Sequence, residues 1–313
     1  MTTAIIKTNT AEVKVNNLAA MIESWLSFIR VAEKSAATYK TAIRQWKKYC
    51  DANKIFSPSR CDIANFIDGL ISAEKSAATV NLYCTAIKLF YRWTALENLY
   101  PNIADHFKSG VKESHGHKKS ALTATQGGML IRSIKGDKII DKRNRAIIAL
   151  TLTAGLRTIE LSRANVGDIE EFDGRYFLRV CGKGRFDKSE KILIAAQVMN
   201  LLKDYFSARG EVADNQPLFL SHRRNLGGRL TTQTISKMIK KNLRGIGLNS
   251  KKMTAHSLRH SAACQMILAG VELRQVQSVL RHKNINTTLI YLDEVDRLKN
   301  VAEQTVADAF FSH

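Results

Sequence analysis

Long apolar segments are missing from this sequence of 313 residues. No uninterrupted apolar run reaches about 18 residues, the length needed to span a membrane. The opening residues, MTTAIIKTNTAEVK, lack the long apolar core of a secretory signal. The sequence therefore predicts a cytoplasmic protein with no membrane among its partners. Proline is also scarce, and Pro58, Pro101 and Pro217 all lie outside the stretches with helical periodicity.

The sequence also lacks the residue groupings that usually hold metals or nucleotides. It has no CxxC pair, no carboxylate trio, no His/Cys ligand spacing and no P-loop, so we expect neither a metal nor any other cofactor. The cysteines are scattered and odd in number, which argues against a disulfide framework and favours reduced, buried thiols. They are Cys50, Cys61, Cys84, Cys181 and Cys264.

Acidic residues are too few to balance the basic ones. Lys and Arg number 48 and Asp and Glu number 28, which gives a net charge of +20. A field of this sign attracts polyanions, chiefly nucleic acid. A general RNA-binding protein is one interpretation, but no aromatic-rich RNA-reading motif is present. The charge balance therefore favours nucleic acid as the partner.

The length and the apolar periodicity predict two domains. We expect residues 1–107 to form an all-helical bundle, with a first helix at about 16–31 and further helices starting at Ser35, Asp62 and Ser76. Basic side chains on its polar helix faces are candidates for DNA contact, although such charges are also common on solvated faces. They are Lys40, Arg44, Lys47, Lys48, Lys88 and Arg92.

A polar, basic segment without hydrophobic period, residues 108–119, has the composition of a linker. Residues 120–313 are expected to form a mostly helical domain with one small antiparallel sheet. Its strands are VGDIEE, RYFLRVC and SEKILIA, the last two joined by a hairpin with the sequence GKGRFDK. Helices are expected at about 124–134, 140–155, 158–164, 196–208, 232–245, 257–269, 273–281, 286–292 and 295–310.

Four motifs of the second domain stand out: AGLRTIEL at 154–161, GKG at 182–184, HSLRH at 256–260 and LRHKNINTTLIYL at 280–292. Together they resemble the tyrosine recombinase (phage integrase) family, and the helical N-terminal domain is similar to that family's core-binding domain. The family pattern is Arg, Lys, His-x-x-Arg, His or Trp, and Tyr. The matching residues here are Arg157, Lys183, His256, Arg259, His282 and Tyr291.

Two arginines of this set suit the chemistry of a phosphodiester. The non-bridging oxygens are negative and gain charge in the transition state, and a guanidinium can donate two parallel hydrogen bonds to them. Arg157 and Arg259 fit this role. Glu160 follows Arg157 by three residues, so it could hold that guanidinium on a shared helix face, although a plain surface ion pair is equally compatible with the spacing.

The resemblance implies proton-transfer roles for other members of the set. Lys183 would be the general acid that protonates the leaving 5′-oxygen, with Arg185 and Lys188 as nearby rivals. His256 would assist proton transfer, and His282 would hydrogen-bond a phosphate oxygen.

Tyr291 is then the nucleophile, and a cluster of Arg, Lys and His lowers the cost of ionising a phenol whose ordinary pKa is about 10. We interpret His260 as a packing or supporting residue. Arg281 stands where the family often has Gly, and it could add a phosphate contact. Arg185 is also a candidate DNA contact.

The resemblance implies an enzyme that cleaves and rejoins duplex DNA through a covalent 3′-phosphotyrosine. Its expected partners are double-stranded DNA with inverted-repeat half-sites and further copies of the chain, a dimer per site and a tetrameric synapse. Integration or excision of a mobile element and resolution are both open. Type IB topoisomerase activity and a non-enzymatic architectural role remain alternatives. A helix over 295–310 is expected to serve assembly.

Overall fold

The computed structural model describes residues 18–31, 33–112, 120–181, 187–222 and 228–312. The chain divides into two compact units, Met1–Ser114 and His115–His313. It is 62% helical with a small antiparallel sheet, which confirms the predicted fold class. Among the described residues, no helix combines the length and apolarity that a membrane crossing requires.

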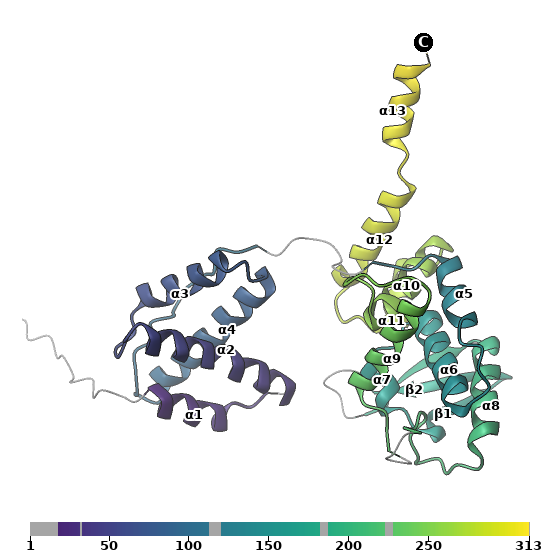
Figure 1. Cartoon of the computed structure of the whole chain (residues 1–313), viewed down its shortest axis with the longest axis horizontal. Coiled ribbons are helices and arrows are strands. Elements are labelled where there is room, and N and C mark those ends of the chain that lie inside the picture. Colours follow the sequence, from purple (N-terminus) through teal and green to yellow (C-terminus); the bar gives the residue numbers. More distant parts are fainter. Residues whose placement is uncertain (1–17, 32, 113–119, 182–186, 223–227, 313) are drawn as a thin grey trace, which may run out of the picture. The chain divides into compact units, whose positions relative to one another are not determined.

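The described residues of the first unit form the helices α1 (Leu18–Phe28), α2 (Glu33–Ala52), α3 (Arg60–Ser72) and α4 (Ala77–Leu96) (Figure 1). Ser76 caps α4 as predicted, because its side chain accepts a hydrogen bond from the backbone N–H of Thr79. Two predicted starts are wrong. Ser35 lies inside α2, and Asp62 is the third residue of α3, where it completes a capping box with Ser59.

Aromatic side chains make up much of the core of this unit. Trp46 is fully buried, packs against Phe66 and donates a hydrogen bond from its indole nitrogen to the Tyr91 hydroxyl at 3.1 Å. Trp25 meets Phe90 edge-on, with their ring centroids 5.7 Å apart. These contacts join α1, α2, α3 and α4, so the unit has a core of its own.

The second unit contains the remaining elements. Its helices are α5 (Ala124–Arg132), α6 (Ile139–Ala154), α7 (Thr158–Arg163), α8 (Ala196–Arg209), α9 (Thr232–Gly245), α10 (Ala255–Leu268), α11 (Leu273–Leu280), α12 (Asn286–Lys299) and α13 (Ala302–Phe311). The buried α6 lies at the centre of the core, where it packs against α8, α9 and α10.

The sheet has three antiparallel strands in the order β1 (Ile169–Phe172), β2 (Arg175–Val180) and β3 (Glu190–Ile194). Val180 pairs with Glu190, so the segment between them joins two paired strands, as predicted for the hairpin. Residues 182–186 of that segment lie outside the described part of the chain.

The turn after α6 brings distant segments together. Gly155 has φ of 61°, and a Cβ at this position would lie 2.6 Å from a methyl carbon of Leu280 on α11. Glycine therefore allows α11 to approach the end of α6. The chain then places Arg157 directly before α7.

The C-terminal helices differ from the prediction. Helix α12 continues to Lys299, whereas we expected a break near residue 294 and a single helix over 295–310. The break lies at Asn300, whose side-chain oxygen accepts a hydrogen bond from the N–H of Ala302. Helix α13 has no buried residue, and its Val306, Phe310 and Phe311 are exposed.

Candidate active site

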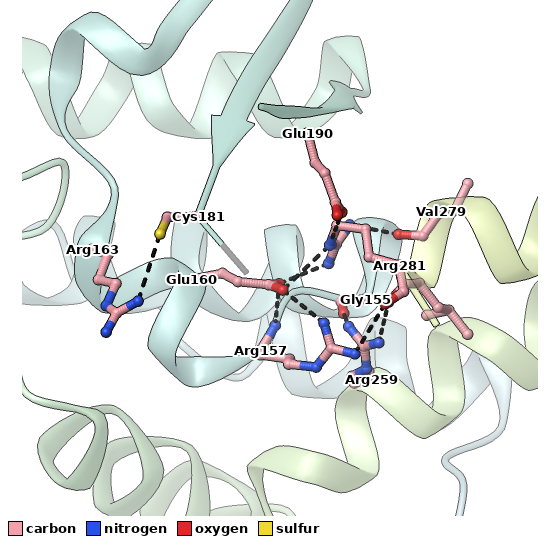
Figure 2. Close-up of polar contacts among 10 residues, drawn as sticks. Gly155, Arg157, Glu160, Arg163, Cys181, Glu190, Arg259, Val279 and Arg281 are labelled. Atoms are coloured by element: carbon pink, nitrogen blue, oxygen red, sulfur yellow. Dashed lines mark hydrogen bonds and ion pairs between the residues drawn. The ribbon is translucent and has the colours of Figure 1, made fainter. Parts of the chain in front are cut away.

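A buried glutamate organises two arginines at the centre of the second unit (Figure 2). Glu160 on α7 accepts hydrogen bonds at 2.8 Å from the backbone N–H and from the guanidinium of Arg157. Its carboxylate also accepts from the Arg281 guanidinium at 2.7 and 3.3 Å. Burial acts to raise the pKa of Glu160, but Arg281 and the Arg157 N–H outweigh it and hold that pKa below its ordinary value. The carboxylate is therefore charged at neutral pH.

Arg281 occupies an unusual backbone position. It ends α11 in the left-handed region, with φ of 55°, where glycine is common and a side chain is disfavoured. Its side chain is only 4% exposed, and its guanidinium also donates to the carbonyl of Val279. In this structure its guanidinium pairs with Glu160, and the possible phosphate contact stays a prediction.

Arg259 lies on the buried side of α10. Its guanidinium donates to the carbonyls of Gly155 and Leu280, the ends of α6 and α11 (Figure 2). Burial, with the nearby charges of Arg157 and Arg281, lowers the pKa of Arg259 to about 9. The group still carries its charge at neutral pH, so three guanidiniums share this centre with the Glu160 carboxylate, and the Glu190 carboxylate lies 3.9 Å from Arg281.

Tyr291 on α12 lies between two histidine rings. Its ring centroid is 5.0 Å from that of His260 and 5.9 Å from that of His282. The side chain is buried, with 1% of the residue exposed. Burial raises the pKa of Tyr291 above its ordinary value, while the positive charges of Arg259 and Arg157 act to lower it. The two arginines therefore offset part of the effect of burial at Tyr291, the tyrosine that the sequence motif identifies as the candidate nucleophile.

Hydrogen bonds orient the histidine that stacks on this tyrosine. His282 Nδ1 lies 2.9 Å from the hydroxyl of Thr288, which is buried one turn before Tyr291. This contact fixes the direction of the His282 ring beside Tyr291. His256 is the second residue of α10 and is exposed, one turn before Arg259 on the same helix.

His260 is fully buried and has polar partners on both ring nitrogens. Its Nε2 lies 2.8 Å from a carboxylate oxygen of Glu294, and its Nδ1 lies 3.7 Å from the sulfur of Cys264. Burial lowers the pKa of His260 to about 4, so the ring is neutral at physiological pH. Burial also raises the pKa of the Cys264 thiol to about 12. The prediction from sequence overlooked this His/Cys spacing.

The proposed general acid and one of its rivals cannot be placed. Lys183 and Arg185 lie outside the described residues. The other rival, Lys188, is described, and its ammonium lies 2.5 Å from the carboxylate of Asp168. An ammonium held in this pair is poorly suited to protonate a leaving group.

The basic residues of the first unit have varied surroundings. Arg44 pairs with Glu23 at 3.2 Å and Lys47 with Asp51 at 2.6 Å, so part of their charge is offset within the unit. The remaining four are exposed or half-buried: Lys40, Lys48, Lys88 and Arg92. Lys88 and Arg92, both on α4, line a hollow of about 380 Å³.

The structure thus joins segments that lie far apart in the sequence. The residues that it brings together from the predicted set are Arg157, Glu160, Arg259, His260, His282 and Tyr291. The roles of Arg281, Thr288 and Glu294 were missed. For Arg281, the sequence offered one signal: arginine stands directly before His282, where the tyrosine recombinase family often has glycine. Thr288 and Glu294 lie one turn on either side of Tyr291, so helical periodicity could have indicated both.

This arrangement suits transfer of a phosphoryl group to a tyrosine. Guanidiniums can stabilise the charge on the non-bridging oxygens, and a phenol beside them is a possible nucleophile. Imidazoles nearby can accept or donate single protons.

Comparison with known proteins identifies similar sequences for both compact units. The model of the phage integrase family matches residues 120–297, and that of a phage integrase N-terminal SAM-like domain matches residues 18–100. Tyrosine recombinase XerA of Pyrococcus furiosus is 29% identical over 271 residues, which cover 87% of this chain and 88% of that protein. Tyrosine recombinase XerC of Caldanaerobacter subterraneus is 38% identical over 173 residues, 54% of this chain but 46% of that protein.

Two solved structures have a similar fold. The XerH site-specific recombinase, bound to palindromic difH substrate in a post-cleavage complex, has a TM-score of 0.72 at 24% identity, covering 85% of this chain and 78% of that one. A lambda integrase dimer bound to a COC′ core site has a TM-score of 0.67 at 17% identity, covering 88% of this chain and 76% of the other.

Proposed function

Because this chain belongs to the phage integrase family of tyrosine recombinases, enzymes that cleave and join DNA strands, we propose that Tyr291 is the nucleophile that attacks a DNA phosphodiester. The phenolic oxygen forms a bond to phosphorus and releases the 5′-oxygen of the next nucleotide. The product is a 3′-phosphotyrosine. One phosphoester replaces another, so the step needs no external energy source, and attack by a 5′-hydroxyl reverses it on the same or a new strand.

One observation carries this proposal: the fold brings Tyr291 on α12 beside His282 and His260 and near Arg259 and Arg157, whose charges act against the burial that raises its pKa. The same two guanidiniums can hold the non-bridging oxygens of the phosphate that the phenolate attacks. A tyrosine with a purely structural role needs no such pair of buried or half-buried cations beside it.

The remaining residues have supporting roles in this proposal. Glu160 holds the Arg157 guanidinium at 2.8 Å and so fixes its direction. His282, oriented by Thr288, donates to a phosphate oxygen. Lys183 protonates the leaving 5′-oxygen, and His256 assists proton transfer. The chemistry therefore requires no metal ion, because cationic side chains stabilise the transition state.

We propose that the substrate is duplex DNA with two inverted half-sites. A dimer binds each site, and two sites meet in a tetrameric synapse. The similar structures support this proposal, because one holds a recombinase on a palindromic substrate and the other holds an integrase dimer on a core site. The resulting reaction integrates or excises a mobile element or resolves joined DNA molecules. The net charge of +20 supplies non-specific affinity for the DNA backbone.

Each compact unit has its own role in this proposal. Residues 1–107 would bind DNA through their basic faces, residues 108–119 would link the units, and residues 120–313 would perform the chemistry. The boundary between the compact units, after Ser114, falls inside the proposed linker. Helix α13, with Val306, Phe310 and Phe311 exposed, is the proposed assembly element that docks on a neighbouring protomer.

A nicked suicide substrate tests the nucleophile. Such a substrate loses a short fragment after cleavage, so the wild-type chain should accumulate as a denaturant-resistant adduct with DNA. Tyr291→Phe should bind the same DNA and form no adduct. Tyr176→Phe is a matched control, because this residue lies on β2, away from the cluster, and it should form the adduct at the wild-type rate. An adduct with Tyr291→Phe would refute the assignment.

A further inference from the structure

Three potential metal ligands lie beside the proposed nucleophile. The donor atoms of His260, Cys264 and Glu294 all lie within 4.8 Å of one another. His260 and Cys264 are four residues apart on α10 and share one helix face. Glu294 comes from α12, one turn after Tyr291. The group therefore connects the helix that carries Arg259 to the helix that carries the nucleophile.

The kinds of donor indicate which ion would suit the site. One thiolate, one imidazole and one carboxylate are ligands that Zn²⁺ accepts together, whereas Mg²⁺ and Ca²⁺ prefer oxygen alone. In a tetrahedral zinc site, donor atoms are about 3.3–3.6 Å apart, from bond lengths near 2.0–2.3 Å. Glu294 lies 2.8 Å from Nε2 of His260, and Cys264 lies 3.7 Å from Nδ1 of the same ring. A single ion would bind one of these nitrogens, and because the three donor atoms lie within 4.8 Å of one another, side-chain shifts of about an ångström would bring them to that separation.

Burial and access also fit a bound ion. His260 is fully buried and Cys264 nearly so, which would protect the bonds from competing water. The Glu294 side chain is 32% exposed, so an ion could enter from its side and keep a water as fourth ligand.

We propose that His260, Cys264 and Glu294 form a binding site for Zn²⁺ or a similar thiophilic divalent cation, and that the bound ion inhibits DNA cleavage. Binding forms bonds from the metal to the Cys264 sulfur, one imidazole nitrogen and one carboxylate oxygen, and it releases the thiol proton to solvent. No electron transfer is involved. The ion takes no part in the cleavage reaction.

The inhibition follows from the position of the nucleophile. Tyr291 is 1% exposed and stacked against His260, so its hydroxyl must become accessible before a phosphate of duplex DNA can reach it. That requires the segment of α12 around Tyr291 to move relative to α10. A metal ion coordinated from both helices would resist this movement, and it would fix the His260 ring against the phenol.

Cobalt binding tests the site without relying on activity. The full-length, reduced, metal-depleted chain is titrated with Co²⁺, and absorption from thiolate-to-cobalt charge transfer is recorded. We expect one equivalent per chain, displaced by Zn²⁺. Cys264→Ser should abolish the charge-transfer band, whereas Cys61→Ser, which removes an exposed thiol of the first unit, should retain it. No band in the wild-type chain, or a band that survives Cys264→Ser, would overturn the proposal.

Glu294→Gln provides a second variant that is expected to fold, because its side chain is partly exposed. It should weaken Co²⁺ binding at least tenfold while the thiolate band persists at saturation. Affinity equal to wild type would remove Glu294 from the site.

An activity measurement tests the inhibition separately. One equivalent of Zn²⁺ should slow formation of the covalent DNA adduct by the wild-type chain and leave the rate of Cys264→Ser unchanged. If zinc binds but the wild-type rate stays the same, the proposed inhibition is wrong. The metal titration does not depend on the cleavage assay, so a chain that cleaves DNA but binds no cobalt refutes this site alone. A metal-depleted chain that forms no adduct, although it binds cobalt once the ion is added, counts against the proposed cleavage chemistry instead.

Discussion

Replacing Glu160 with glutamine removes the negative charge that holds the arginine cluster together. The Glu160 side chain is fully buried and its partner Arg281 is 4% exposed, so this pair is sheltered from solvent. Removing one partner of a buried ion pair typically costs about 3–5 kcal/mol. Because glutamine keeps the shape and one acceptor oxygen, we expect the lower end, a loss of about 3 kcal/mol in the free energy of unfolding. The Arg157 side chain, which also pairs with Glu160, is 29% exposed, so loss of this second pair should add little to the loss of stability.

Urea unfolding can isolate this effect within the second unit. All three tryptophans, Trp25, Trp46 and Trp93, lie in the first unit, so their fluorescence reports that unit. Circular dichroism reports helices of both. We expect Glu160→Gln to shift the dichroism transition of the second unit to lower urea while the fluorescence transition stays in place. Glu171→Gln, at an exposed position on β1, should change stability by less than about 0.5 kcal/mol.

The pH dependence provides an independent check. The folded-state pKa of Glu160 is lowered, so its stabilisation is present above the ordinary carboxyl pKa of about 4.3 and is lost as pH falls through the lower value. The stability difference between the wild-type chain and Glu160→Gln should therefore narrow in acid. A difference below about 0.5 kcal/mol at neutral pH would refute the role assigned to this carboxylate.

Three further outcomes are expected. Arg157→Ala and Arg259→Ala should each slow adduct formation by at least about 10²–10³-fold, with modest losses of DNA affinity, and near-wild-type rates in both would contradict their assignment. Lys183→Ala should be slow on normal DNA but nearly normal when sulfur replaces the 5′-bridging oxygen, because a thiolate leaves without protonation. If Arg185→Ala shows this rescue instead, the general acid is misassigned. Deleting residues 302–313 should preserve half-site binding, measured by mobility shift, and abolish cooperative filling of two half-sites. Normal recombination by the truncated chain would exclude α13 as the assembly element.

Local signals in the sequence predicted most of the helices. Apolar periodicity identified their positions, and Ser76 marked a helix start because its side chain satisfies a free backbone N–H. Ser35 was misleading, since α2 begins two residues earlier at Glu33, where an acidic side chain is favourable in the first turn. The predicted end near residue 294 failed because Asp293 and Glu294 carry no helix-breaking signal.

The active-site residues could be selected only with the help of the family resemblance. Arg157 and Arg259 are about a hundred residues apart, and periodicity contains no information that α6 and α11 meet at Gly155. The pairing of Arg281 with Glu160 spans 121 residues and depends on a left-handed backbone that glycine normally adopts. Such a contact follows from tertiary packing.

The most direct test of the account is to identify the amino acid that becomes attached to DNA. The wild-type adduct from the suicide substrate is digested with protease and nuclease, and the linked peptide is sequenced by tandem mass spectrometry. The account predicts a single peptide from α12 with the nucleotide 3′-phosphate on Tyr291. A phosphate on any other residue would contradict it.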